Sequence, residues 1–235
     1  MPRIPLIEDL VKGPIPVGSN ILVEFDPASQ WLNASLAMAA GWLRTGGRVS
    51  YLAEGQSPDD VRARLKELGL NVEDLEKRDQ FWITDFYTAG TIGQKSKERF
   101  YIDSLKVADM SIWIGKEVLH EPPAPDFLVI ADNTSVLDRF NEEENWVELM
   151  LSRVFPMGKS RLLTQIAGVM GGGVHSQWAY KQMEAVADCI IDFKLDETGS
   201  ETRDLMRIRS MRKAFFDRKW HALKALENFD VILQD

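Results

Sequence analysis

Cysteine and histidine are scarce in this chain of 235 residues, which contains one cysteine and three histidines. A single cysteine excludes an intramolecular disulfide framework and a cysteine-based zinc site. The histidines, His120, His175 and His221, lie far apart and lack metal-ligand spacing, so we predict no metal site. Cys189 lies within the apolar run 187–191, and we predict that it is a buried core thiol.

An excess of positive charge is also missing. The 28 Lys and Arg residues face 36 Asp and Glu residues, a net charge of −8 that disfavours chain-wide attraction to nucleic acid or anionic membranes. The first ten residues contain no long apolar run behind a basic cluster, so we expect neither a secretory signal nor a membrane anchor. A cytoplasmic protein is therefore expected.

Short apolar runs alternate with stretches of helical periodicity, and glycine or proline separates many of them. The sequence predicts strands over 21–25, 48–53, 81–84, 127–132, 161–167 and 189–194. It predicts helices over 31–43, from Ser57-Pro58 to Gly69, over 96–118 with a break near Gly115, over 142–154 and over 177–186, with an extended proline linker over 122–125. Residues 205–212, 220–226 and 231–233 have the alternation of antiparallel hairpins.

This order of elements predicts an α/β fold. Strands that alternate with helices form a mostly parallel central sheet with helices on both faces, and the C-terminal hairpins extend one edge. Ligands of such sheets bind beyond the carboxyl ends of the strands. The loops that follow the strands are therefore where functional residues are expected.

The turn after the first of these strands reads Phe25-Asp26-Pro27-Ala28-Ser29-Gln30-Trp31-Leu32-Asn33. A phosphate-binding loop needs glycines for close backbone approach, then Lys for the β- and γ-phosphates and Ser or Thr for magnesium. In its frame, this turn resembles the phosphate loop of the RecA superfamily, in particular of the KaiC and RadA-like ATPases. The family pattern is an apolar strand, Gly-Asp-Pro-Gly-Ser-Gly-Lys-Thr and an Ala/Leu-rich helix.

The residues that would bind phosphate differ from that pattern. Asp26, Pro27 and Ser29 match it, but the three glycines, the lysine and the hydroxyl residue are replaced by Phe25, Ala28, Gln30, Trp31 and Leu32. We therefore predict that the loop remnant 26–33 does not bind ATP in the usual way, and we expect no cofactor. Trp31 has two interpretations, a core-filling indole, which we favour, and a platform that stacks on a bound base.

The resemblance covers nearly the whole chain and implies a single RecA-like domain over residues 1–235. The run 127–132 resembles the Walker B strand, whose acid, here Asp132, holds magnesium through water; the alternative is an acid that caps a turn. Gln165 resembles the polar sensor residue at the end of the next strand.

Two acids polarise the attacking water in this family, and other residues stand at both of their positions in this chain. Gly55 and Gln56 occupy their places, and Glu54 lies one residue earlier. In an extended segment, a shift of one residue turns the side chain to the other face unless a bulge re-aims it. We therefore expect Glu54 to face away from the site.

The run Arg207-Ile208-Arg209-Ser210-Met211-Arg212 resembles the late Lys-Met-Arg element that reaches a neighbouring subunit's nucleotide in KaiC-like rings. Arg212 matches the arginine, but Ser210 replaces the lysine. Because several catalytic parts are altered, we predict a catalytically inactive protein with a regulatory or scaffolding role through a protein partner or a homo-oligomer. The alternative is an ATPase with an atypical loop that binds ATP and Mg²⁺ and uses Glu54, Asp132 and Arg212.

The C-terminal segment 203–224 is strongly basic, with eight Lys and Arg residues, two Asp residues and a net charge of +6. Its candidate surface residues are Arg207, Arg209, Arg212, Lys213, Arg218 and Lys219. Protein contact and a solvated sheet edge are the favoured interpretations. Nucleic-acid binding, as in a recombinase-paralogue-like modulator, is a further one. The glycines at 171–173 predict a flexible connector, with DNA contact as the alternative.

Overall fold

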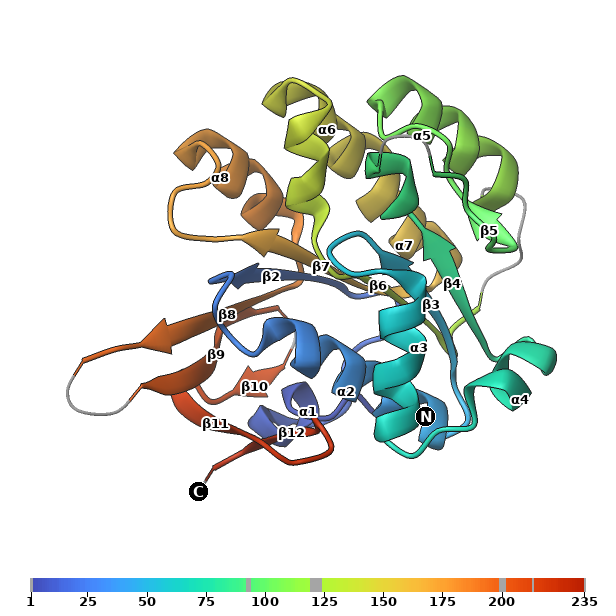
Figure 1. Ribbon diagram of the computed structural model, residues 1–235. Helices are drawn as coiled ribbons and strands as arrows, with labels where there is room; N and C mark the ends of the chain where they lie inside the picture. Colours follow the sequence, from blue (N-terminus) through green and yellow to red (C-terminus); the bar gives the residue numbers. More distant parts are fainter. Residues whose placement is uncertain (1, 92–93, 119–123, 199–201, 213, 235) are drawn as a thin grey trace.

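The computed structural model describes residues 2–91, 94–118, 124–198, 202–212 and 214–234 (Figure 1). Its strands are β1 (Val11–Lys12), β2 (Asn20–Phe25), β3 (Arg48–Ala53), β4 (Phe81–Asp85), β5 (Phe100–Tyr101), β6 (Phe127–Ala131), β7 (Thr164–Met170), β8 (Cys189–Asp196), β9 (Arg203–Met211), β10 (Phe215–Phe216), β11 (His221–Ala225) and β12 (Val231–Leu233).

The α-helices are α1 (Ile7–Leu10), α2 (Trp31–Arg44), α3 (Pro58–Glu67), α4 (Val72–Lys77), α5 (Val107–Trp113), α6 (Glu143–Leu149), α7 (Phe155–Arg161) and α8 (Gln177–Val186). Two 3₁₀ helices, η1 (Thr88–Gly90) and η3 (Thr134–Arg139), and two π-helical turns, η2 (Ile114–Val118) and η4 (Met150–Val154), complete the set. None of the helices in the described ranges is long and apolar enough to cross a membrane.

Ten of the strands form one sheet in the order β12-β11-β9-β8-β2-β7-β6-β3-β4-β5. The pairs from β8 to β5 are parallel, whereas β9, β11 and β12 join antiparallel. This arrangement confirms the predicted α/β class and the antiparallel C-terminal extension. The strands β1 and β10 form a separate antiparallel pair that the sequence did not predict, and it ties the N-terminal segment to the tip of the C-terminal hairpin.

The helices cover the sheet in two layers, with α2 and α3 on one side and α5, α6 and α8 on the other (Figure 1). The core under the first layer includes Trp31 and Met38 of α2, both without exposed surface. The core under the second layer includes Trp146 of α6 and Met183 of α8, which are also fully buried. Burial of these large side chains on both faces supplies most of the hydrophobic stabilisation of the sheet.

Local capping fixes where α3 begins and ends. Ser57 Oγ accepts the Asp60 N–H at 3.2 Å, and Pro58 occupies the first turn, where no intrahelical N–H bond is lost. Gly69 follows the helix with φ of 84°, a conformation that glycine adopts without strain. The predicted boundaries of this helix are confirmed.

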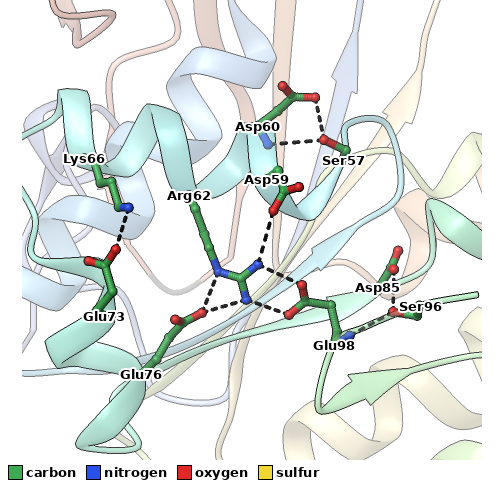
Figure 2. A network of polar contacts seen from close by, with 10 residues as sticks. All are labelled: Ser57, Asp59, Asp60, Arg62, Lys66, Glu73, Glu76, Asp85, Ser96 and Glu98. Carbon is green, nitrogen blue, oxygen red and sulfur yellow. Dashed lines mark hydrogen bonds and ion pairs between the residues drawn. The ribbon is translucent and has the colours of Figure 1, made fainter.

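An arginine on α3 joins three segments that are distant in sequence (Figure 2). The Arg62 guanidinium pairs with Glu76 of α4 at 2.8 Å and with Glu98 at 2.6 Å. The hydrogen bonds that Arg62 donates to Glu98 are the main cause of its raised pKa. Next to this network, Ser96 Oγ donates to Asp85 Oδ2 at 2.6 Å. These contacts hold Ser96 and Glu98 in a loop that leads into β5.

Two predicted helices have different boundaries in the structure. The helix expected over 96–118 begins only at α5, because the contacts of Ser96 and Glu98 fix the preceding residues as a loop and the strand β5. The helix expected over 142–154 continues through η4 and α7 and ends at Leu162 with φ of 58°. The strand expected over 161–167 is therefore wrong at its start, since β7 covers Thr164–Met170. Residues 122–123 of the predicted proline linker lie outside the described ranges.

Candidate functional site

The turn between β2 and α2, residues 26–30, is closed by its own polar atoms. Asp26 Oδ1 accepts the Ala28 N–H at 2.9 Å, and the Asp26 carbonyl accepts the Ser29 N–H at 2.9 Å and its hydroxyl at 2.6 Å. The Gln30 N–H donates to Asp204 Oδ1 of β9 at 3.1 Å. Partial burial raises the pKa of Asp204, and the hydrogen bond from Gln30 opposes this rise. A carboxylate of the chain itself therefore occupies the start of α2, where backbone N–H groups attract anions.

Trp31, the first residue of α2, is completely buried. Its ring lies against Phe25, with 6.0 Å between centroids, and against Phe193 of β8, at 5.4 Å. Its Nε1 donates to the Asp132 carbonyl at 2.7 Å. A Cβ added to Gly168 of β7 would lie 2.6 Å from Trp31 Nε1, so the indole fits only because this position has no side chain. The geometry agrees with the core-filling interpretation of Trp31.

Asp132 and Glu54 form a buried acidic pair at the carboxyl ends of β6 and β3. Asp132 has no exposed surface, and its Oδ1 accepts the N–H groups of Glu54 at 2.9 Å and of Gly55 at 2.8 Å. The Glu54 carboxylate is 4 % exposed and accepts the Asn133 N–H at 3.1 Å. The expectation that Glu54 faces away from the site is wrong, because β3 ends at Ala53 and strand alternation stops there.

Burial controls the protonation of these two acids. Desolvation raises the pKa of Asp132 from 3.8 to about 6, although the N–H groups of Gly55 and Glu54 act against the rise. Desolvation, together with the charge of Asp132, raises the pKa of Glu54 well above its ordinary value. Two carboxylates so close together in a dry site do not both ionise readily. Burial and the neighbouring charge therefore both favour the protonated form of Glu54.

Gln165 lies at the amino end of β7, paired with Val129 and with Asn20 at the start of β2. The acids and the turn 26–30 lie at the carboxyl ends of these strands, on the opposite edge. The sensor placement predicted for Gln165 is therefore wrong. The reason is the extension of α7 to Arg161, which shifts β7 three residues along the chain relative to the predicted strand.

A histidine that the sequence left unassigned stabilises the connector after β7. The ring of His175 is buried, with Nε2 at 2.6 Å from Ser135 Oγ and Nδ1 at 2.8 Å from Asp138 Oδ2 and 3.5 Å from Glu143 Oε1. One ligand-type atom each of His175, Asp138 and Glu143 lies within 4.8 Å of the others, a grouping that sequence spacing did not reveal. The buried ring anchors the segment that follows the glycines at 171–173, so His175 does not project outward as DNA contact requires.

A family model described as "ATPase: KaiC" matches residues 3–233. The chain belongs to the KaiC family. A UPF0273 protein of Aeropyrum pernix is 23 % identical over 232 residues, which are 99 % of this chain and 92 % of the relative. A UPF0273 protein of Pyrococcus horikoshii is 22 % identical over 99 % of this chain and 92 % of its own length.

A protein of known crystal structure has the same fold as this chain. The crystal structure of a KaiC-like protein from Pyrococcus horikoshii superposes with a TM-score of 0.75, over 99 % of this chain and 96 % of that protein, at 17 % identity. The predicted family and the RecA-like α/β fold are therefore confirmed. At this identity the likeness concerns the fold and leaves the activity to be argued from the site.

The late basic element of this KaiC family member is largely paired within the chain. Arg209 contacts Glu24 at 2.5 Å, Glu184 at 2.7 Å and Asp192 at 3.2 Å. Arg207 pairs with the same Asp192 at 2.6 Å and lies over the Trp220 ring. These two arginines are therefore not free to neutralise phosphates.

The remaining basic residues lie on the surface or outside the described ranges. Arg212, Arg218 and Lys219 are exposed, and Lys213 is not described. Arg212 follows β9 next to the start of β8, at the amino edge of the parallel strands, where its Nη2 donates to the Ala185 carbonyl at 2.6 Å. Within one chain, the structure brings Glu54 and Asp132 together and leaves Arg212 at the other edge.

Proposed function

We propose that this KaiC family protein does not hydrolyse ATP and acts as a regulatory or scaffolding protein through contacts with a protein partner or with further copies of itself. One observation carries the proposal. The Trp31 side chain is buried at the head of α2, where the resemblance places the phosphate-binding lysine. An indole that packs on two aromatic rings and bonds to a backbone carbonyl supplies no charge for a phosphate.

The surrounding residues fit MgATP poorly. A phosphate needs free backbone N–H groups and a cation, but the Gln30 N–H already bonds to the Asp204 carboxylate. A magnesium ion needs free carboxylate oxygens, whereas Asp132 Oδ1 already accepts the N–H groups of Glu54 and Gly55. We therefore derive no catalytic step through a nucleotide.

Exposed groups support the second half of the proposal. Phe215 of β10 is 82 % exposed, and the exposed cations Arg212, Arg218 and Lys219 lie in the same C-terminal segment. Large exposed aromatic and arginine side chains are common in protein interfaces. The chain also carries exposed acids at the start of α6, Glu142 and Glu144, which can pair with such cations on another copy.

Calorimetric titration of the full chain with MgATP, together with an assay for phosphate release, tests the proposal. We expect neither saturable binding nor turnover above a heat-denatured sample. Nanomolar to low-micromolar MgATP binding would overturn it.

The second candidate is an ATPase with an atypical loop, favoured by the contact between Glu54 and Asp132. That activity must disappear in Asp132→Ala and persist in Asp103→Ala, a matched change at an exposed acid. Turnover that responds in this way would favour the enzyme over the scaffold.

A further inference from the structure

A cavity of about 410 Å³ lies between the sheet and the helical layer of α5, η4 and α7. No residue of the turn 26–33 lines it. Its walls are mainly apolar and include Leu52, Phe86, Val129, Met110, Trp113 and Met150. Pockets for small ligands have volumes of about 300–1,000 Å³, and even an apolar cavity of about 150 Å³ takes up benzene. This cavity is therefore large enough to hold a small organic ligand.

An arginine without an anionic partner lines the same cavity. Arg161, the last residue of α7, is 9 % exposed, and its Nη1 has no hydrogen-bond partner. No ion pair of Arg161 is found within the described part of the chain. The other two arginines of the lining are paired, Arg48 with Asp126 at 2.8 Å and Arg99 with Asp79 at 2.9 Å. A buried cation without a counter-charge is costly, so this position favours an anion.

A glutamine adds hydrogen-bonding capacity to the lining. Gln165 of β7 is 4 % exposed, and neither its Oε1 nor its Nε2 has a partner. Buried polar groups are almost always hydrogen-bonded in folded proteins, so two orphaned atoms in one cavity wall indicate a polar ligand group or water there. The amide N–H and the Arg161 guanidinium are both hydrogen-bond donors in the lining of this cavity, so each can bind an oxygen of an anion.

We propose that this cavity binds a small amphiphilic monocarboxylate, with its alkyl body among the apolar walls and its carboxylate on Arg161 and Gln165. The class follows from the lining. The mainly apolar walls disfavour a highly polar molecule. A polyanion would need several free cations, but among the described lining residues only Arg161 lacks an acidic partner. The apolar area alone would accept a neutral hydrocarbon, but a neutral ligand leaves the guanidinium uncompensated. The lining contains no residue of the turn 26–33, but it includes Glu54 of the buried acidic pair.

Titration of the full chain with decanoate, with decanol as the uncharged probe, tests the proposal. We expect saturable, one-to-one decanoate binding by calorimetry and a change in tryptophan fluorescence, because Trp82 and Trp113 line the cavity. Arg161→Met should weaken decanoate binding at least tenfold and change decanol binding less than twofold. Arg153→Met, a matched change at an exposed arginine of η4, should alter neither.

A filled-cavity variant keeps the test decisive if Arg161→Met fails to fold. Ala167→Leu adds bulk to the lining from β7 and should weaken both decanoate and decanol at least tenfold. Circular dichroism and thermal melts establish that each variant is folded. Absence of saturable decanoate binding by the wild-type chain, decanoate affinity unchanged in folded Arg161→Met, or affinities unchanged in Ala167→Leu would each overturn the proposal.

Discussion

At the scale of single residues, Trp31 joins several parts of the fold through contacts of different kinds. Its indole packs on Phe25 and Phe193, bonds to the Asp132 carbonyl and fills the space above Gly168. The three packing partners belong to different strands, because Phe25 ends β2, Phe193 lies in β8 and Gly168 lies in β7, and Asp132 directly follows β6. One side chain at the head of α2 thus joins the helix to the centre of the sheet.

Replacing Trp31 should therefore destabilise the protein strongly. We expect Trp31→Ala to lower the free energy of unfolding by about 3–5 kcal/mol, because it leaves a large cavity, and Trp31→Phe to cost less. Urea denaturation measures both. The control is Trp178→Ala, at a tryptophan that is 45 % exposed, where we expect a loss below about 1 kcal/mol. Equal losses at the two positions would contradict this account of Trp31.

Asp132 should make stability depend on pH. Its pKa is 3.8 in an ordinary environment and about 6 in the folded protein, so between these values the folded state keeps a proton that the unfolded state releases. Its contribution is favourable at low pH and is lost as the pH rises from about 4 to about 6. Relative to Asp132→Asn, the wild-type free energy of unfolding should fall by about 3 kcal/mol across this range.

Chemical denaturation at a series of pH values measures that difference. Asp103→Asn, at an exposed position, is the control and should show no such trend. A difference between wild type and Asp132→Asn that is constant with pH would show that Asp132 is not the titrating group.

At the scale of elements, local signals predicted the structure well where capping and periodicity agree. The capped helix α3 and the buried strand β6 lie where the sequence places them. Cys189 is 1 % exposed as predicted, and burial raises the pKa of its thiol to about 12. The periodicity of an apolar run is sufficient to identify such elements.

The wrong predictions depend on distant partners. Glu98 is held by Arg62 from α3, and no local pattern around residue 98 contains that information. Gln165 was misplaced because the preceding helix continues through a π-helical turn and Pro156, a residue that usually ends a helix. The contact of Glu54 with Asn133 likewise joins two loops that are close only in the folded sheet.

The Arg62 network gives a prediction for the attachment of α3 and α4. We expect Arg62→Met to lower the free energy of unfolding by about 1–3 kcal/mol, because Glu98, with a side chain only 14 % exposed, loses its charge partner. Arg78→Met removes an exposed i,i+4 pair with Asp74 and should cost less than about 1 kcal/mol. Thermal or urea denaturation of the two variants measures the contrast, and equal costs would refute it.

At the scale of the whole molecule, charge is balanced locally across the sheet. The basic C-terminal segment lies beside acids of β2, β8 and α8, and Arg209 contacts one acid from each. The chain as a whole has a net charge of −8, which adds to the local neutralisation of these arginines. Arg207 and Arg209 therefore add little to the positive surface of this segment, whereas Arg212, Arg218 and Lys219 remain exposed.

This balance predicts weak binding to nucleic acid. We expect no measurable binding of single-stranded DNA by fluorescence anisotropy at about 0.15 M salt, where non-specific contacts are weak. Arg209→Glu should lower thermal stability, whereas Arg212→Glu, at an exposed position, should not. Salt-dependent DNA binding that is lost in Arg212→Glu would instead support a DNA-binding modulator.

The absence of a side chain at Gly168 has a consequence for how this chain changes over evolution. A Cβ at position 168 would lie 2.5 Å from the Asp132 carbonyl oxygen and 2.6 Å from Trp31 Nε1. Because the backbone contact remains whatever residue stands at position 31, we expect glycine at position 168 in homologues with and without a tryptophan at the head of α2. A smaller residue at position 31 would therefore leave a void that position 168 cannot fill.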